Sequence, residues 1–130
     1  MRLNTAMKLS ASGMTAERFR MDVISSNIAN ANSTSVNGQS AYRRRTVELT
    51  TTEEGVRINS IIEDQSNFRE VYEPGNPNAD RVSGMVTYSN VDPLKEMVDM
   101  MSATRAYEAN VSAFNSAKGM VRSALNIGKL

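Results

Sequence analysis

Both ends of this chain carry a seven-residue apolar repeat. Stepping four and then three residues from the N-terminal end gives seven apolar positions out of nine, the nine being Leu3, Met7, Ser10, Met14, Glu17, Met21, Ile24, Ile28 and Ala31. A strict 3.5-residue period over about four heptads is typical of a coiled-coil seam, because the stripe of an ordinary surface helix drifts with the 3.6-residue turn. The repeat therefore predicts an N-terminal helix that packs against another helix.

The second repeat lies near the C-terminus. Its positions are Met100, Ala103, Tyr107, Asn110, Phe114, Ala117, Val121 and Ala124. Asp92 followed by Pro93 is typical of an N-cap and a first-turn proline, which predicts where this helix begins. A helix of about 30 residues is about 45 Å long. The polar Asn110 of this repeat, like Glu17 of the first, either faces solvent or sets the register of the helix packing.

The segment between the repeats is polar and rich in turn formers. Asn30, Asn32 and Gly38 favour the end of the first helix and a turn after it. From Tyr42 onward the apolar period changes to two residues, which predicts short strands near residues 46–49, 56–62, 68–72 and 85–88, with a hairpin loop at 51–55. The proline- and glycine-rich stretch 74–80 predicts a further turn.

These elements predict an α+β fold, in which long N- and C-terminal helices form an antiparallel coiled-coil-like pair around a small β-rich middle segment. We expect an N-terminal helix at 1–32, a turn-rich β segment at 33–91 and a C-terminal helix at 92–130, together forming a single structural unit. A two-helix pair buries little surface by itself. We therefore expect other copies or partners to complete the seams.

The composition lacks the side chains on which most catalytic sites depend. The chain has no histidine and no cysteine, so the commonest general base, nucleophile and thiolate ligand are missing. Glu53 and Glu54 lie in the predicted turn, where solvated charge is the ordinary explanation, and no phosphate-loop or dinucleotide-binding motif is present. We expect no enzyme activity, no cofactor and no metal site.

The charges are balanced, with 15 basic and 14 acidic residues, so no whole-protein field favours nucleic acid or anionic lipid. The basic run Arg43, Arg44 and Arg45 has two interpretations, a nucleic-acid patch or a strand flank that forms salt bridges. Alternation along a strand would divide the run between two faces and favours the second. No apolar run approaches 18 residues, which predicts no membrane-spanning segment, and the N-terminus resembles no cleaved signal peptide.

The residues themselves are familiar. SGMTAERFRMDVISSNIANANSTSVNG, at 12–38, resembles the N-terminal signature of the bacterial flagellar axial proteins, the rod, hook and hook-associated subunits. In that family an amphipathic helix ends in an N-I-A-N segment followed by a turn. Three later segments are similar to those of proximal-rod subunits: YRRRTVEL, VYEPGNPNAD and NVDPLKEMVDMMSATRAYEANVSAFNSAKGM. The resemblance spans essentially the whole chain.

The resemblance implies a structural subunit of the flagellar basal-body rod, a hollow helical tube that transmits torque and carries exported subunits. It implies export by a type III route, without a cleaved signal peptide, into the periplasmic space. The implied partners are other copies of the chain, companion rod proteins, components of the membrane ring and export apparatus, and a rod-capping factor.

Under this interpretation the heptad positions form the assembly seam, and Asn27, Asn30 and Gly38 form the turn at the helix end. The seam residues are Leu3, Met7, Met14, Met21, Ile24, Ile28, Met100, Tyr107, Asn110, Phe114 and Val121. Two alternatives stay open. One is another axial subunit of the rod or hook, which would share the N-terminal signature. The other is a helical adaptor or nucleic-acid-binding protein, which salt-dependent retention on DNA would reveal.

Overall fold

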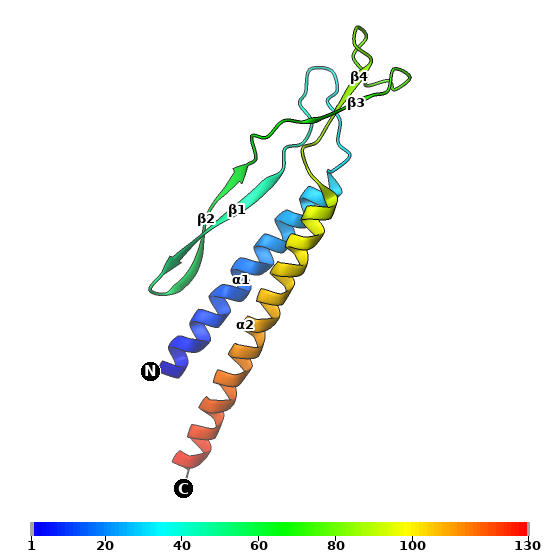
Figure 1. Ribbon diagram of the computed structural model, residues 1–130. Coiled ribbons are helices and arrows are strands. Elements are labelled where there is room, and N and C mark those ends of the chain that lie inside the picture. Colours follow the sequence, from blue (N-terminus) through cyan, green and yellow to red (C-terminus); the bar gives the residue numbers. More distant parts are fainter. Residues whose placement is uncertain (1, 130) are drawn as a thin grey trace. The chain divides into compact units, whose positions relative to one another are not determined.

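The chain is described here by a computed structural model that covers residues 2–129, with two long helices and four short strands in that range (Figure 1). In chain order the elements are α1 (Arg2–Ala29), β1 (Arg45–Thr52), β2 (Gly55–Glu63), β3 (Arg69–Tyr72), β4 (Met85–Tyr88) and α2 (Pro93–Gly128). The predicted α+β class is confirmed, with terminal helices that run antiparallel and a small β-rich middle.

Helix α1 ends beside a cluster of asparagines. Its 28 residues stop at Ala29, where the backbone hydrogen bonds tighten to a shorter spacing. The Ala31 N–H donates to the Ile28 carbonyl at 3.3 Å, and the Ser33 N–H donates to the Asn30 carbonyl at 3.1 Å. The side chain of Asn30 also donates to the Ser26 carbonyl at 2.8 Å. The asparagines therefore satisfy the last carbonyls locally and end the helix before residue 32.

Helix α2 begins where the sequence placed it. Asp92 is the N-cap: its Oδ1 accepts a hydrogen bond from the Leu94 N–H at 3.1 Å, and its carbonyl accepts one from the Glu96 N–H at 3.0 Å. Pro93 fills the first turn, where its missing N–H leaves no bond unmade. With 36 residues, α2 is longer than α1.

The described residues form two compact units. The first contains residues 2–21, 47–60 and 101–129, and the second contains 22–46 and 61–100. Small aliphatic side chains dominate both cores, as the low aromatic content would suggest. Ala16, Ala103 and Ala117 are buried in the first unit, and Ile24, Ala41, Val86 and Val91 in the second. The predicted segment boundaries at 32 and 91 remain predictions.

In the first unit the β1–β2 hairpin docks on α1 through a glycine. The Val56 N–H donates to Ser12 Oγ at 3.1 Å, and this hydroxyl donates to the Leu9 carbonyl at 2.7 Å. Gly55 has a φ of 123°, which favours glycine, and a Cβ at that position would lie 2.1 Å from Ser12 Oγ. The hairpin can approach the helix this closely only because residue 55 has no side chain.

The second unit contains an antiparallel hairpin of β3 and β4, in which Arg69 is paired with Tyr88 and Tyr72 with Met85. The chain after α1 runs beside β4, since the Ser35 N–H donates to the Thr87 carbonyl at 3.0 Å.

A two-residue turn follows this segment. Asn37 and Gly38 both have positive φ, at 49° and 82°, and Val36 and Gln39 exchange backbone hydrogen bonds across them. An Asn-Gly pair with these angles is the preferred turn for a tight hairpin. Gly38 therefore forms a separate turn well beyond the end of α1.

We expect Gly55→Ala to lower the free energy of unfolding by about 1–3 kcal/mol, because the new methyl combines an unfavourable φ with a steric clash against Ser12. Urea denaturation of the purified protein would measure the loss. Gly75→Ala is the matched control, because no heavy atom lies within 4 Å of a Cβ built there and its φ is outside the glycine-favouring region. Equal stabilities for the two variants would show that the hairpin does not depend on Gly55.

Candidate functional site

The predicted seam residues lie on the sides of the helices that face each other. Of the eleven, Ile24 is buried with 5% exposure and the other ten are half-buried. In the first unit, Leu3 and Met7 line one groove together with Val121. The Thr104 hydroxyl donates to the sulfur of Met21 at 3.6 Å. The heptad surface is therefore used within the chain, and its role in assembly stays a prediction.

Asn110 fits into this helix pair beside a glycine. A Cβ at Gly13, which is buried on α1, would lie 2.7 Å from Asn110 Nδ2. The Asn110 amide donates to the Ala106 carbonyl one turn earlier on α2, at 3.0 Å. The amide is thus satisfied by its own helix, and the contact with Gly13 is steric. Glu17 likewise pairs within its own helix, with Arg20 at 3.4 Å.

The Asn27 side chain joins several segments of the second unit by hydrogen bonds. It is fully buried in the last turn of α1. Its Nδ2 donates to the Arg45 carbonyl at 2.7 Å and to Glu96 Oε2 at 3.1 Å, and its Oδ1 accepts from the Arg45 N–H at 3.0 Å and the Tyr42 hydroxyl at 2.9 Å. All four hydrogen-bonding positions of the amide are occupied. The side chain holds the backbone of Arg45 at both its N–H and its carbonyl, as a neighbouring strand would.

Arg44 extends this arrangement into a buried ion network. Its Nε donates to Glu96 Oε1, and its two terminal nitrogens lie 3.4 Å from Asp64 Oδ2 and 3.3 Å from Asp99 Oδ2. The Glu96 side chain is 1% exposed and that of Arg44 is 14% exposed. The Arg44 N–H also donates to Asn90 Oδ1 at 2.7 Å. One guanidinium therefore joins carboxylates from α2 and from the segment after β2.

The charges of this network follow from its geometry. Burial lowers the pKa of Arg44, but the hydrogen bond to Glu96 and the carboxylates of Glu96, Asp64 and Asp99 outweigh it, so the pKa is raised. The pKa of Asp64 is lowered, first by hydrogen bonds from the backbone and side chain of Ser66 and then by Arg44. Both groups are held in their charged forms.

The other two residues of the arginine run have separate partners. Arg43 donates to the carbonyls of Asp64 and Ser66 at 3.0 and 3.1 Å, and its guanidinium lies 4.3 Å from the centre of the Phe68 ring. The guanidinium of Arg45 lies 5.5 Å from the Tyr42 ring centre. Each arginine thus has its own contacts within the second unit, which supports the interpretation of the run as a strand flank that forms salt bridges.

Sequence reasoning missed the partners in this network: Tyr42, Arg44, Asn90 and Glu96. One signal was available for Glu96, because it lies four residues before Met100 and so continues the C-terminal heptad pattern with a charged residue. A charge at a seam position requires a buried partner. The partner's identity was hidden, since Arg44 is 52 residues away in the chain.

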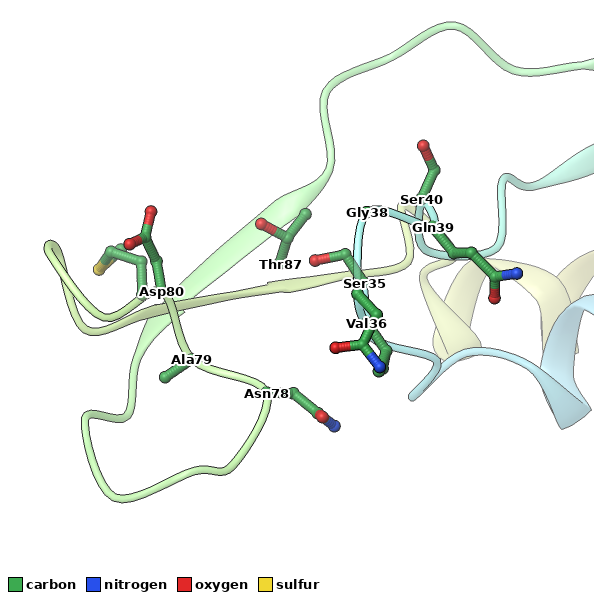
Figure 2. Close-up of a pocket in the computed structure, with 11 residues that line it drawn as sticks. Ser35, Val36, Gly38, Gln39, Ser40, Asn78, Ala79, Asp80 and Thr87 are labelled. Atoms are coloured by element: carbon green, nitrogen blue, oxygen red, sulfur yellow. The ribbon is translucent and has the colours of Figure 1, made fainter.

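A polar hollow of about 330 Å³ lies elsewhere in the second unit, between the 35–40 turn and the loop at 78–80 (Figure 2). Its side chains form hydrogen bonds within and between the loops of the second unit. Asn78 donates to Thr34 Oγ1 at 3.1 Å, and Asp80 accepts from the Val82 N–H at 2.8 Å. Within residues 2–129, no group of three or more acidic residues is placed to hold a metal ion. Nor does either helix in that range have a stretch long and apolar enough to cross a membrane.

Comparison with known proteins assigns the chain to a family. A family model described as flagella basal body rod protein matches residues 3–36, and one described as flagellar basal body rod FlgEFG protein C-terminal matches residues 82–127. The flagellar basal-body rod protein FlgC of Bacillus subtilis (strain 168) is 46% identical over 95% of this chain and 97% of its own length. The FlgC proteins of Borreliella burgdorferi and Escherichia coli O157:H7 are 37% and 38% identical, over 98% and 99% of this chain and 98% and 100% of their own. The chain belongs to the FlgC family of flagellar basal-body rod proteins.

The two family models match the parts of this FlgC-family chain that contain the helix pair. The first covers nearly all of α1 and continues to Val36, so it includes Asn27. The second covers β4 and α2 as far as Ile127, so it includes Glu96. The hydrogen bond between these two side chains thus joins the two matched regions across 69 residues of sequence.

In this FlgC-family protein we expect Asn27→Ala to lower the free energy of unfolding by about 2–4 kcal/mol, because it leaves the Arg45 backbone and Tyr42 hydroxyl buried without partners. Asn30→Ala is the matched control, since that side chain makes one exposed bond to Ser26, and we expect it to cost less than about 1 kcal/mol. Urea denaturation would measure both. Similar costs would refute a special role for Asn27.

The lowered pKa of Asp64 predicts acid sensitivity. A carboxyl whose pKa is lowered by folding stabilises the protein above its usual value near 3.8, and this contribution is lost as the pH falls through the folded-state pKa. We therefore expect the wild-type protein to lose stability more steeply below about pH 4 than Asp64→Asn, which does not titrate. Thermal unfolding followed by circular dichroism from pH 7 to pH 3 would compare them. Parallel curves would contradict the assignment.

Proposed function

We propose that this chain is a structural subunit of the flagellar basal-body rod and that it assembles through the side of α2 that faces away from α1. In the first part of α2, Leu94, Val98 and Met101 are exposed by 71, 58 and 57%, at spacings of four and three residues. Side chains at these spacings lie on one face of a helix. A large apolar stripe left exposed on one face marks an interaction surface.

The later part of α2 also has exposed apolar side chains, although the series that begins at Leu94 continues through Arg105 and Glu108. Met120 and Ile127, seven residues apart, are exposed by 58 and 73%. Between residues 109 and 117 the helix has no charged residue. Its exposed positions there are alanine, serine and asparagine. Small side chains let another helix approach closely, because the interaxial distance depends on the side chains at the contact. The face suits helix packing better than solvation.

Assembly through such a face is directional. An outward face of α2 would meet a different surface on the next subunit, which gives a heterologous contact that propagates as a helical array. Fully burying one of the exposed leucine, valine or methionine side chains stabilises the contact by about 1.5–3 kcal/mol. Under the proposal, the heptad seam keeps each helix pair rigid, and its half-buried members, such as Met14 and Phe114, make further contacts.

The finer parts of the proposal follow from the family. The rod would be a hollow tube that transmits torque and carries exported subunits, with companion rod proteins, membrane-ring and export components and a rod-capping factor as partners. The subunit would reach the periplasmic space without a cleaved signal peptide and would catalyse no reaction. The engagement of each residue of the arginine run within the second unit supports a packing role over nucleic-acid binding.

We expect Val98→Glu to abolish motility and rod assembly while leaving the melting temperature of the purified protein within a few degrees of wild type, because the new charge is solvated in the monomer and buried only on assembly. Swimming in soft agar and electron microscopy of purified basal bodies would test this. Val82→Glu is the matched control, since Val82 is 97% exposed in the loop before β4 and we expect that variant to swim. A motile Val98→Glu strain would exclude this face.

A further inference from the structure

The acidic residues of this chain are confined to its middle. All 14 lie between Glu17 and Glu108. Residues 1–16 and 109–130 contain no aspartate or glutamate, but they contain five basic residues: Arg2, Lys8, Lys118, Arg122 and Lys129. The near-zero net charge of the whole chain therefore hides a strong segregation. The start of α1 and the end of α2 belong to the same unit and lie at the same end of the helix pair (Figure 1).

This end of the helix pair also has an apolar groove. Leu3 and Met7 of α1 and Val121 and Leu125 of α2 line a hollow of about 490 Å³. Leu125 is 64% exposed, whereas Val121 one turn earlier on α2 is half-buried. A second hollow of about 480 Å³ adjoins the first, since both are lined by Ala124 and Leu125, and Arg122 and Lys129 line the second. The apolar surface is thus bordered by basic side chains.

The groove exists because α2 extends past the beginning of α1. Val121 shares the groove with Leu3, almost the first residue of α1. The last residues of α2 therefore have no α1 residue opposite them (Figure 1). The seam continues on one helix only, and Ile127 is 73% exposed. A third helix placed in the groove would complete the interrupted seam, as in a three-helix coiled coil.

We propose that this groove binds an amphipathic helix of another protein whose apolar side is flanked by carboxylates. Apolar side chains would fill the space between Leu3 and Leu125, and the flanking carboxylates would meet Arg122 and Lys129. This inference rests on the proposed function in one respect, that the occupant is taken to be a neighbouring protein of the rod.

A second copy of this chain fits the groove less well. Its exposed apolar helix face includes Leu94 and Val98, and Lys95 lies at the edge of this face. The carboxylates of Glu96 and Asp99 on that helix are bonded to Arg44. That face would bring a positive charge to a positive groove. The charges therefore favour a partner with a different sequence.

A designed peptide tests the proposal on the full-length chain. The probe is a fluorescein-labelled helix of three heptads with leucine at the two seam positions and glutamate at the flanking positions, where like charges disfavour its self-association. The control peptide has lysine in place of glutamate. We expect saturable binding of the glutamate peptide by fluorescence anisotropy, weakened by salt, and no binding of the lysine peptide.

Matched variants locate the site. We expect the double change Arg122→Glu and Lys129→Glu to weaken binding of the glutamate peptide by at least about tenfold, since it exchanges two attractions for two repulsions. Leu125→Asn should also weaken binding, and its exposure makes unfolding an improbable cause, which circular dichroism would check. Arg81→Glu with Lys95→Glu is the control, because both residues are exposed in the second unit, and we expect unchanged binding.

Other outcomes would overturn the inference. Equal binding of the two peptides, or binding that the Arg122 and Lys129 changes leave intact, would exclude the charged groove. Self-association of the chain in sedimentation that Leu125→Asn abolishes, without peptide binding, would assign the groove to a second copy. Binding to vesicles of phosphatidylcholine and phosphatidylglycerol, without peptide binding, would assign it to a lipid surface. None of these results would alter the expected loss of motility in Val98→Glu, so the two proposals fail separately.

Discussion

The buried side chain of Glu96 is the constraint on which the second unit depends. A carboxylate with 1% exposure is tolerated only with a charged partner and further hydrogen bonds, and here Arg44 and Asn27 supply both. Removing one partner of such a pair costs about 3–5 kcal/mol, whereas the intact pair adds little net stability over apolar packing. The network joins the end of α1, the segment before β1 and the start of α2 through defined hydrogen bonds. Its main effect is therefore on how these segments are positioned.

The helix pair of the first unit follows a different principle. Its seam is built from methionine, alanine and a few larger side chains, so that shape complementarity decides the register. Gly13 makes room for Asn110, and Gly55 makes room for Ser12. Close approach at two glycines fixes the positions of the helix and the hairpin without any buried charge. A methionine-rich seam is adaptable by itself, so these two steric contacts supply the precision that the seam lacks.

The sequence predicted most of the elements because each has a local cause. The heptads predicted the helices, and two-residue alternation predicted the strands. The Asp92 cap and Pro93 predicted the start of α2. The end of α1 at Ala29 also has a local cause, because the Asn30 side chain satisfies a carbonyl of the last turn. The ion network was not predictable. The partners of Arg44 lie 20, 52 and 55 residues away, and no local pattern shows which carboxylate a distant guanidinium will meet.

The seam residues show the limit of periodicity more clearly. A heptad pattern establishes that a helix face is covered, but it does not identify the covering helix. Both repeats here are covered first by each other, which leaves an exposed apolar stripe on the opposite side of α2, at Leu94, Val98 and Met101. That side has no strict repeat, because a surface that meets a neighbouring subunit needs complementarity to that neighbour and not to a supercoil. For the assembly proposed above, the contact residues are therefore those that periodicity alone would pass over.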